Sequence, residues 1–340
     1  MRAEIVFFAV AGCAAFIVNA DVSMEERRAT DVSRARGYAY GAKAKEVFCV
    51  VDQDGVPVAG ARIYGAFVGG PDVNGFTDKN GVYTAKGRCK DWLSYSFLKE
   101  GYYETCGKVQ YLDTTSFPAV VSGKWQPYGS RRQIVLKRIK NPKKMICQDL
   151  YDKKFFGRYK YPAFDRWVGF DLAQKDWVQP FGEGAISDVM LRFTRDDSKN
   201  YYRSMEVSFT NTPFAGAYIM NKESFSEFKT TYMVDTNMTF RPYYYFDYQN
   251  APVGRHNNVL NNDQYMVFRI RTKVDANGNL ISAHYGRLMG GWDFFERGGM
   301  AMANEFLNPV PNDLNLEDAE TARKAVLGYK QFLEQLQNEK

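Results

Sequence analysis

The histidines limit the nucleophile chemistry open to this chain, because its 340 residues contain only two of them. A nucleophile–histidine–acid triad needs an imidazole placed by the fold beside a Ser or Cys side chain. His256 lies in the polar stretch Arg255-His256-Asn257-Asn258, and His284 lies in a predicted strand. Both positions are typical of surface or structural histidines. The sequence also lacks G-x-S-x-G, H-E-x-x-H and a P-loop, so acyl transfer, zinc proteolysis and nucleotide chemistry lose their usual motifs.

Paired carboxylates are the remaining route to catalysis, because glycosidases work with two Asp or Glu side chains and need no histidine. The candidates for such a pair are Asp171, Asp176, Glu183, Asp188 and Glu305. Acidic residues beside Gly and Trp also commonly cap turns, and spacing along the chain places no two of these residues together. We therefore assign no catalytic residue and keep a polysaccharide hydrolase as the alternative function.

Two Asp-rich turns, at residues 52–55 and 78–81, have the form Asp-x-[Asp/Asn]-Gly. Neither continues to the distal Glu that completes a calcium-binding loop. Asp-Gly and Asn-Gly favour positive φ and commonly reverse the chain between strands. We expect ordinary turns here, and we expect neither a metal nor a cofactor.

Aromatic side chains give the strongest binding signal. The run Tyr243-Tyr244-Tyr245-Phe246-Asp247-Tyr248 places tyrosines on both faces of one strand, and three tryptophans lie in the same predicted domain. Exposed Tyr and Trp rings near Asn and Asp suit stacking on sugar rings, whereas buried rings would fill the core or a contact between domains. The candidate binding residues among them are Tyr243, Tyr244, Tyr245, Tyr248, Trp177 and Trp292, with Trp167 as a further aromatic of this domain.

A basic row is expected on the next strand, where Arg269, Arg271 and Lys273 alternate with apolar residues. A period of two would place these side chains on one face, where they either meet an anionic polysaccharide or are solvated. We add Arg269 and Arg271 to the candidate binding residues. The net charge of +6 is spread along the chain, and its short basic runs at 131–132, 137–140 and 143–144 are typical of solvated strand ends and a linker. No nucleic-acid partner is expected.

Cysteine usage agrees with an exported protein. Cys49, Cys89, Cys106 and Cys147 remain after the predicted signal segment, and four cysteines allow three disulfide pairings. We favour Cys89 with Cys106 and Cys49 with Cys147, with buried free thiols as the alternative. A zinc site is not expected, because the chain lacks a C-x₂-C pair and is poor in histidine.

Residues 1–20 have the form of an export signal. Arg2 gives a positive start, an apolar run fills residues 5–18, and residues 18–20 form a small-residue cleavage site. The run is short for a membrane-spanning helix, and no other segment of the sequence is suited to crossing a bilayer. A retained anchor and a lipoprotein attached at Cys13 are the alternatives. We expect a periplasmic, cell-surface or secreted protein.

The first third of the mature chain alternates apolar runs with turns. Strands are predicted at residues 46–51, 61–68, 81–86, 92–99, 103–111 and 132–139. The pattern D-x-D-G-x-P-V-x-G-A at 52–61, with T-D-x-x-G-x-Y at 77–83 and Gly101-Tyr102, resembles the carboxypeptidase regulatory-like module. That resemblance implies a seven-stranded Ig-like or prealbumin-like β-sandwich at residues 45–140, and it implies no particular activity.

The rest of the chain predicts a second, larger antiparallel β-sandwich-type domain at residues 163–312, after a polar leader at 21–44 and a linker at 141–162. Its strands are expected at 167–172, 188–194, 203–209, 214–220, 229–234, 238–246, 265–274, 279–288 and 300–307. Residues 313–340 predict an amphipathic helix capped by Asn315, which either packs on its own domain or pairs with a second copy.

Two phrases, residues 169–184 and 308–317, resemble a group of exported bacterial proteins in which a regulatory-like sandwich precedes a β-rich domain of unknown role. The resemblance brings no catalytic residues. The sequence therefore predicts an all-β, exported, non-enzymatic protein that binds a glycan or another envelope protein. We also expect residues 44–139 to fold alone, because their apolar alternation and turns are self-contained.

Overall fold

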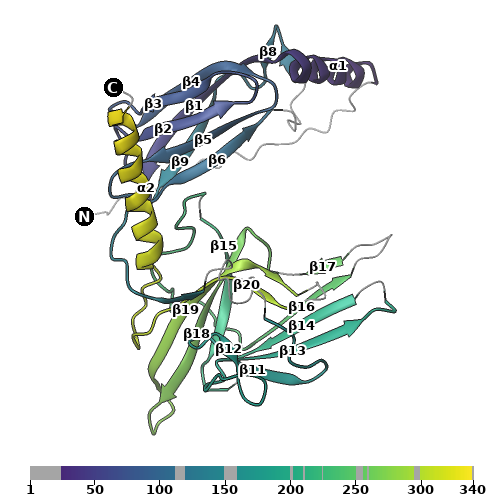
Figure 1. Ribbon diagram of the computed structural model, residues 1–340, viewed down its shortest axis with the longest axis vertical. Coiled ribbons are helices and arrows are strands. Elements are labelled where there is room, and N and C mark those ends of the chain that lie inside the picture. The colour runs from purple at the N-terminus through teal and green to yellow at the C-terminus, as the bar shows by residue number, and fades with distance from the viewer. Residues whose placement is uncertain are drawn as a thin grey trace, which may run out of the picture.

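The computed structural model describes residues 24–111, 119–148, 159–199, 202–209, 211–223, 225–249, 256–258, 260–294 and 299–338. The fold is all-β: two β-sandwiches of mostly antiparallel strands, with helix α1 (Met24–Tyr40) before the first and helix α2 (Ala319–Asn338) after the second (Figure 1). The predicted export signal and Cys13 lie outside the described residues. Within those residues, no helix is long and apolar enough to cross a membrane.

The first sandwich has seven longer strands, as predicted, and two strands of two residues each. One sheet joins β4, β1, β9, β8 and β7, in which β1 pairs antiparallel with β4 and parallel with β8 and β9. The other sheet has the order β3-β2-β5-β6. The strands are β1 (Ala42–Asp52), β2 (Arg62–Phe67), β3 (Asp72–Phe76), β4 (Val82–Cys89), β5 (Trp92–Leu98), β6 (Thr105–Gln110), β7 (Val120–Val121), β8 (Lys124–Trp125) and β9 (Ser130–Leu136).

The Asp-rich turns of this sandwich are closed by the aspartate side chains. The Asp52 carboxylate accepts hydrogen bonds from the backbone N–H groups of Asp54 and Val56, and Asp78 does the same for Asn80 and Val82. The glycines that end the two turns, at positions 55 and 81, have φ of 80° and 73°. Local turn chemistry therefore explains both motifs, as predicted.

Most of the predicted polar leader forms helix α1. Helix α1 packs on the first sandwich at Gly37, where an added Cβ would lie 2.6 Å from the Trp125 ring. A larger residue there would push the helix off the buried indole. Strand β1 begins at Ala42, so the first strand starts within the predicted leader of residues 21–44.

The second sandwich has sheets of five and six strands, in the orders β10-β20-β19-β18-β15 and β12-β11-β13-β14-β16-β17. Strand β10 pairs with β20, so the predicted linker contains a strand of this domain. The strands are β10 (Ile146–Gln148), β11 (Trp167–Asp171), β12 (Asp176–Trp177), β13 (Val189–Asp196), β14 (Tyr202–Ser208), β15 (Gly216–Asn221), β16 (Tyr243–Gln249), β17 (His256–Asn258), β18 (Gln264–Val274), β19 (Leu280–Asp293) and β20 (Ala301–Leu307).

The two sheets of this domain differ in how they are covered. Their facing sides enclose the main core, which includes Phe170, Phe193, Met205 and Phe268. The outer face of the five-stranded sheet carries a second apolar cluster, in which Tyr265 of β18 packs with residues from the segments 222–241 and 308–318. A strand predicted at 229–234 is wrong, because this part of the chain forms the irregular cover of that face.

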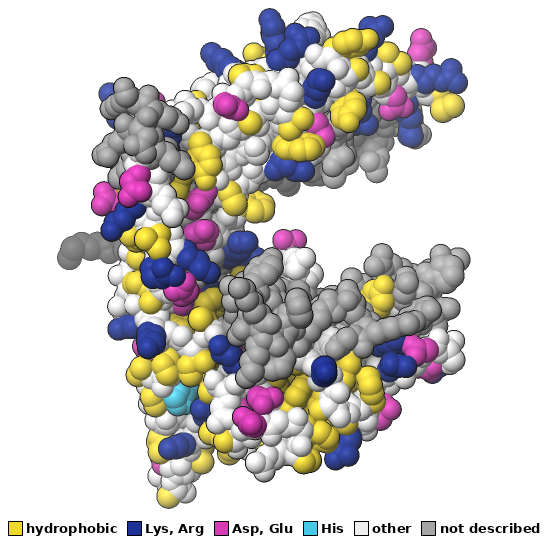
Figure 2. Space-filling model, viewed as in Figure 1, with side chains coloured by type: hydrophobic (Ala, Val, Ile, Leu, Met, Phe, Trp, Pro, Cys, Tyr) yellow, Lys and Arg dark blue, Asp and Glu magenta, His cyan; other side chains and the backbone are white. Residues whose placement is uncertain are grey.

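The two sandwiches meet at a buried junction beside the start of α2, and an open gap separates them on the side away from α2 (Figures 1 and 2). Glu317 is fully buried there and accepts hydrogen bonds from the Tyr103 hydroxyl and from the backbone N–H groups of Lys140 and Asn141. Lys137 is buried as well, and its ammonium pairs with Glu223 at 2.7 Å. The prediction that Lys137 lies in a solvated strand end is therefore wrong.

Helix α2 begins four residues later than its predicted cap. Asp318 caps it, because its carboxylate accepts a hydrogen bond from the N–H of Thr321. Asn315 instead donates its side-chain N–H to the carbonyl of Asn141 and so holds the linker. Ala322 is buried at the junction, whereas Val326 is 42% exposed. The first turns of α2 thus pack on the protein itself.

Candidate ligand-binding face

The outer face of the six-stranded sheet carries one row of side chains that are directly opposite one another on four neighbouring strands. Trp167 of β11 is paired with Arg192 of β13, Arg192 with Glu206 of β14, and Glu206 with Tyr245 of β16. Residues that pair in this way have side chains on the same side of a sheet. The four therefore form a line across the strands, which we call the Trp167–Tyr245 row.

Contacts within the row hold its side chains in place. The Arg192 guanidinium lies 5.1 Å from the centre of the Trp167 ring and pairs with the Glu206 carboxylate at 2.5 Å. The Tyr243 hydroxyl donates to the other oxygen of Glu206 at 2.5 Å. Because each side chain is tied to a neighbour, little conformational entropy remains to be lost when a ligand binds.

Two tyrosines of β16 are exposed on this face, namely Tyr245 in the row and Tyr243 beside it. Tyr243 is 46% exposed and Tyr245 is 42% exposed. The hydroxyl of Tyr245 shares a hydrogen bond with that of Tyr202 on β14. This bond restrains the Tyr245 side chain, and a large part of its surface remains accessible to solvent. Flat, fixed aromatic rings of this kind suit stacking on a planar ligand.

The electrostatics of the row keep its tyrosines protonated. The hydrogen bond to Glu206 raises the pKa of Tyr243, and burial adds to that rise. The pKa of Tyr245 is raised by burial and then by its bond to Tyr202. Both rings therefore stay neutral at physiological pH, and the Arg192 and Glu206 charges cancel within the row.

The other predicted aromatic residues are placed differently. The Tyr244 ring faces inward, donates its hydroxyl to the Ala217 carbonyl at 2.6 Å and packs parallel to Phe246. Tyr248 lies on the same inward side of β16 and is half-buried. Trp177 is buried in the main core, where its indole N–H donates to the Lys160 carbonyl, so its assignment as a binding residue is wrong. The side chain of Trp292 lies outside the described residues.

The predicted basic row does not form. Arg271 has φ of 50° at a register shift in β18, and it forms ion pairs with Asp188 at 2.8 Å and Asp171 at 3.1 Å. Arg269 lies 4.1 Å from the Phe240 ring and donates to the Phe214 carbonyl. The bulge breaks the period of two, so these arginines serve the fold and not a shared basic surface.

Two of the candidate catalytic carboxylates, Asp171 and Asp188, do meet, but at Arg271 and below the surface. Burial would raise the pKa of Asp171, yet four backbone N–H donors outweigh it and lower that pKa. Burial raises the pKa of Asp188, with Arg271 opposing the rise. Both carboxylates are fully engaged in closing loops. They do not flank an open cleft, which a hydrolytic pair requires.

The remaining candidate carboxylates give no catalytic pair either. Asp176 accepts hydrogen bonds from the N–H groups of Trp177 and Glu183 and so closes a turn, while Glu183 itself is exposed. Glu305 is 1% exposed, and neither of its carboxyl oxygens has a hydrogen-bond partner among the described residues. Burial raises its pKa well above the ordinary value. The five carboxylates therefore lend no support to the hydrolase alternative.

Neither predicted disulfide is present, because the four described thiols are free. Cys89 is buried inside the first sandwich, whereas Cys106 is exposed on the outer face of β6. Cys49 lies on the outward side of β1, and Cys147 belongs to β10 of the second sandwich. Side chains that point to opposite sides of a sandwich cannot bridge. The four described thiols are free, as in the alternative, but of these four only Cys89 is buried.

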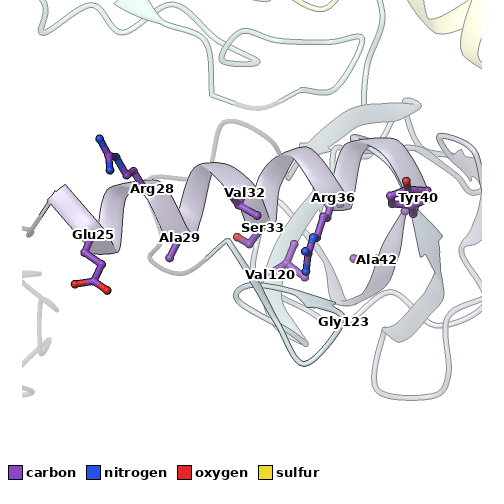
Figure 3. Close-up of a pocket in the computed structure, with 12 residues that line it drawn as sticks. Glu25, Arg28, Ala29, Val32, Ser33, Arg36, Tyr40, Ala42, Val120 and Gly123 are labelled. Carbon is purple, nitrogen blue, oxygen red and sulfur yellow. The ribbon is translucent and has the colours of Figure 1, made fainter.

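A hollow of about 700 Å³ lies between α1 and the β7–β8 hairpin of the first sandwich. Ser33 and Arg36 of α1 line the hollow together with Val120 of β7 (Figure 3). The hollow is open to solvent and lined mainly by apolar atoms. It contains none of the candidate binding residues, and we assign no ligand to it.

Two of the four row residues, Tyr245 and Trp167, stood out in the sequence as aromatics, whereas Arg192 and Glu206 did not. The missed residues share one signal: each is the polar or amphipathic member of a strand that alternates with core residues. That signal marks an outer face, but it does not show which strands are neighbours.

No protein-family model matches the chain, and no curated protein matches its sequence. The 3-chlorocatechol 1,2-dioxygenase of Rhodococcus opacus 1CP is 13% identical over 29% of this chain and 61% of its own, with a TM-score of 0.24. The TIE protein of Bacillus anthracis is 8% identical over 82% and 49% of the respective chains, with a TM-score of 0.22.

BcpA, the major pilin subunit of Bacillus cereus, is 10% identical over 78% of this chain and 96% of its own, with a TM-score of 0.21. This chain thus spans less than two thirds of the dioxygenase and of the TIE protein. At these TM-scores we draw nothing about activity from the neighbours. The β-sandwich architecture rests on the strand pairing described above.

Proposed function

We propose that this protein is an exported, non-enzymatic binding protein that recognises a polysaccharide at the outer face of its six-stranded sheet. The observation that carries the proposal is the Trp167–Tyr245 row with its exposed, fixed tyrosines. Export is proposed from residues 1–20, and residues 45–140 are proposed as a module of the carboxypeptidase regulatory-like type. In this proposal the second sandwich binds the polysaccharide, and the first sandwich supports it through the buried junction.

Sugar recognition combines ring stacking with hydrogen bonds to hydroxyl groups, and the row offers both in one line. Tyr243 and Tyr245 supply accessible rings, and Arg192 and Glu206 supply donors and acceptors between the aromatic ends. The row lies on the outer face of one sheet, because its members are paired across neighbouring strands. A sheet face suits an extended polymer, whereas small ligands usually bind in concave pockets.

A glycan array with the purified mature chain tests this proposal, and a matched pair of variants locates the site. Tyr243→Ala should abolish array signals. Tyr64→Ala is the control, because Tyr64 is 40% exposed on the first sandwich and donates to the Glu104 carboxylate at 2.6 Å, much as Tyr243 does to Glu206. Equal loss in both variants, or a protein ligand recovered from envelope extract in place of any glycan, would refute polysaccharide binding at this face.

A further inference from the structure

The direction of the row defines an axis for its ligand. Its four members are opposite one another, so the line from Trp167 to Tyr245 runs across the strands. Three steps between neighbouring strands, each about 4.8 Å, give it a length of about 14 Å. Aromatic rings stand at its two ends, and the polar pair Arg192–Glu206 stands in the middle. A ligand that uses all four side chains must be extended and must lie across the sheet.

The length of the row also limits the size of that ligand. A pyranose ring in an extended chain advances by a length close to the spacing between two neighbouring strands. The row is therefore about three sugar rings long. The outer rings would stack near Trp167 and Tyr245, and the middle ring would present its hydroxyls to Arg192 and Glu206.

The charges around the row favour an uncharged ligand. Arg192 is neutralised by Glu206 at 2.5 Å. Near the end of β13, Asp196 lies opposite Tyr202 on the same side of the sheet as the row, and it pairs with Lys199 at 3.3 Å. An anionic polymer would have to displace these carboxylates before it met a cation. A neutral sugar hydroxyl can instead donate to Glu206 and accept from Arg192 without disturbing their ion pair.

We infer that the row binds a neutral, extended polysaccharide whose chain axis runs across the strands and which occupies about three ring subsites. The inference rests on the proposed function and deepens it, since it names the charge, the orientation and the length of the bound segment. Trp167 marks one end of the site. Tyr245 marks the other end, and Tyr243 lies next to it on β16.

Calorimetric titration of the mature chain with linear, uncharged gluco- and manno-oligosaccharides, from disaccharide to hexasaccharide, tests this inference. Affinity should rise with each ring up to the trisaccharide or tetrasaccharide and then level off. Trp167→Ala should weaken the longer ligands about tenfold and leave the disaccharide nearly unchanged, because it removes one end of the row. The affinities should change little with salt concentration, because no net charge is neutralised on binding.

The outcomes separate this inference from the proposed function. Stronger, salt-dependent binding of an oligogalacturonate would overturn the neutral ligand. Affinity that is independent of chain length, or a Trp167→Ala variant that weakens all lengths equally, would overturn the three-ring axis. In both cases Tyr243→Ala would still abolish glycan binding, and the proposed function would stand. If no oligosaccharide or array glycan binds, both fail together.

Discussion

Arg192 and Arg287 occupy corresponding places on the outer faces of the two sheets of the second sandwich. Each pairs with a carboxylate at 2.5 Å, Arg192 with Glu206 and Arg287 with Asp318. Each guanidinium also lies against an aromatic ring, Trp167 for Arg192 and Phe306 for Arg287. The decisive difference is exposure, since the Arg192 side chain is 38% exposed and that of Arg287 is 3% exposed.

This comparison shows that burial by neighbouring segments, and not residue type, determines whether an arginine–carboxylate pair is structural or open to a ligand. The segments 222–241 and 308–318 bury the outer face of the five-stranded sheet, so Arg287 and Asp318 are removed from water and serve the fold. A buried ion pair depends on its partner, because a lone buried charge is very costly. The corresponding pair on the six-stranded sheet remains partly solvated, where its contribution to stability is small and its groups are available to a ligand.

The largest expected effect is at the covered pair. Arg287→Met should lower the free energy of unfolding by about 3–5 kcal/mol, because it leaves Asp318 buried without its partner. Urea denaturation followed by tryptophan fluorescence would measure the loss. Arg323→Met is the matched control, since its pair with Glu320 is exposed on α2. A loss no greater than that of the control would mean that the cover does not isolate the pair from water.

The junction beneath the same cover should be the next most sensitive place. Glu317→Ala leaves the Tyr103 hydroxyl and two backbone N–H groups without their acceptor. We expect a cost of about 1–3 kcal/mol, the range for buried donors that lose their partner. Thermal melting compares it with Glu320→Ala, whose exposed side chain should change stability little. If both variants melt alike, Glu317 does not hold the two sandwiches together.

A buried acid between the two sheets should make stability depend on pH. Burial raises the pKa of Glu305 in the folded protein, with Asp188 and Asp171 adding to the rise and Lys175 opposing it. The folded state thus keeps a proton that the unfolded chain releases. The stabilisation is complete below about pH 4.5 and is lost as the pH rises toward the folded pKa.

Glu305→Gln should therefore be more stable than the parent at neutral pH and similar to it below about pH 4.5. The substitution should remove a pH dependence of the free energy of unfolding of at most about 1.4 kcal/mol per pH unit. Chemical denaturation at a series of pH values would show the two curves converge on the acid side. Parallel curves would mean that Glu305 ionises in the fold at its ordinary pKa.

The smallest effect on stability is expected at the exposed Arg192–Glu206 pair. The effect of the same change on binding should be large. Arg192→Met should change the free energy of unfolding by less than about 1 kcal/mol, as exposed ion pairs do. The same change should weaken oligosaccharide binding, because Arg192 lies in the middle of the row. Differential scanning calorimetry and titration on the same sample would measure both. A destabilisation close to that of Arg287→Met would remove the contrast between the two faces.

Local sequence patterns predicted much of the fold. The period of two in β13, β14 and β18 predicted antiparallel strands with one side in the core. The Asp-Gly and Asn-Gly turns were predictable as well, because an aspartate side chain can close such a turn on its own backbone. These features depend on residues within a few positions of one another, and a single sequence displays them directly.

Features that depend on partners far along the chain were not predictable. The bulge at Arg271 turned a predicted basic row into an internal ion-pair site, and burial converted Trp177 and Lys137 from apparent surface groups into structural ones. Cover for the five-stranded sheet comes from two irregular segments, and part of the first, at 229–234, has the sequence pattern of a strand. Propensity does not encode which segment will cover a sheet, because packing decides it.

The amino-acid pattern alone shows that β16 carries tyrosines on both of its sides and that Trp167 begins a strand. It does not show that Tyr243 and Tyr245 face solvent, or that Trp167, Arg192 and Glu206 lie in line with Tyr245, because these facts depend on the register of the strands. Pairing between β11, β13, β14 and β16 is set by the shared core on their inner side, and a shift of one residue would have turned every member of the row inward.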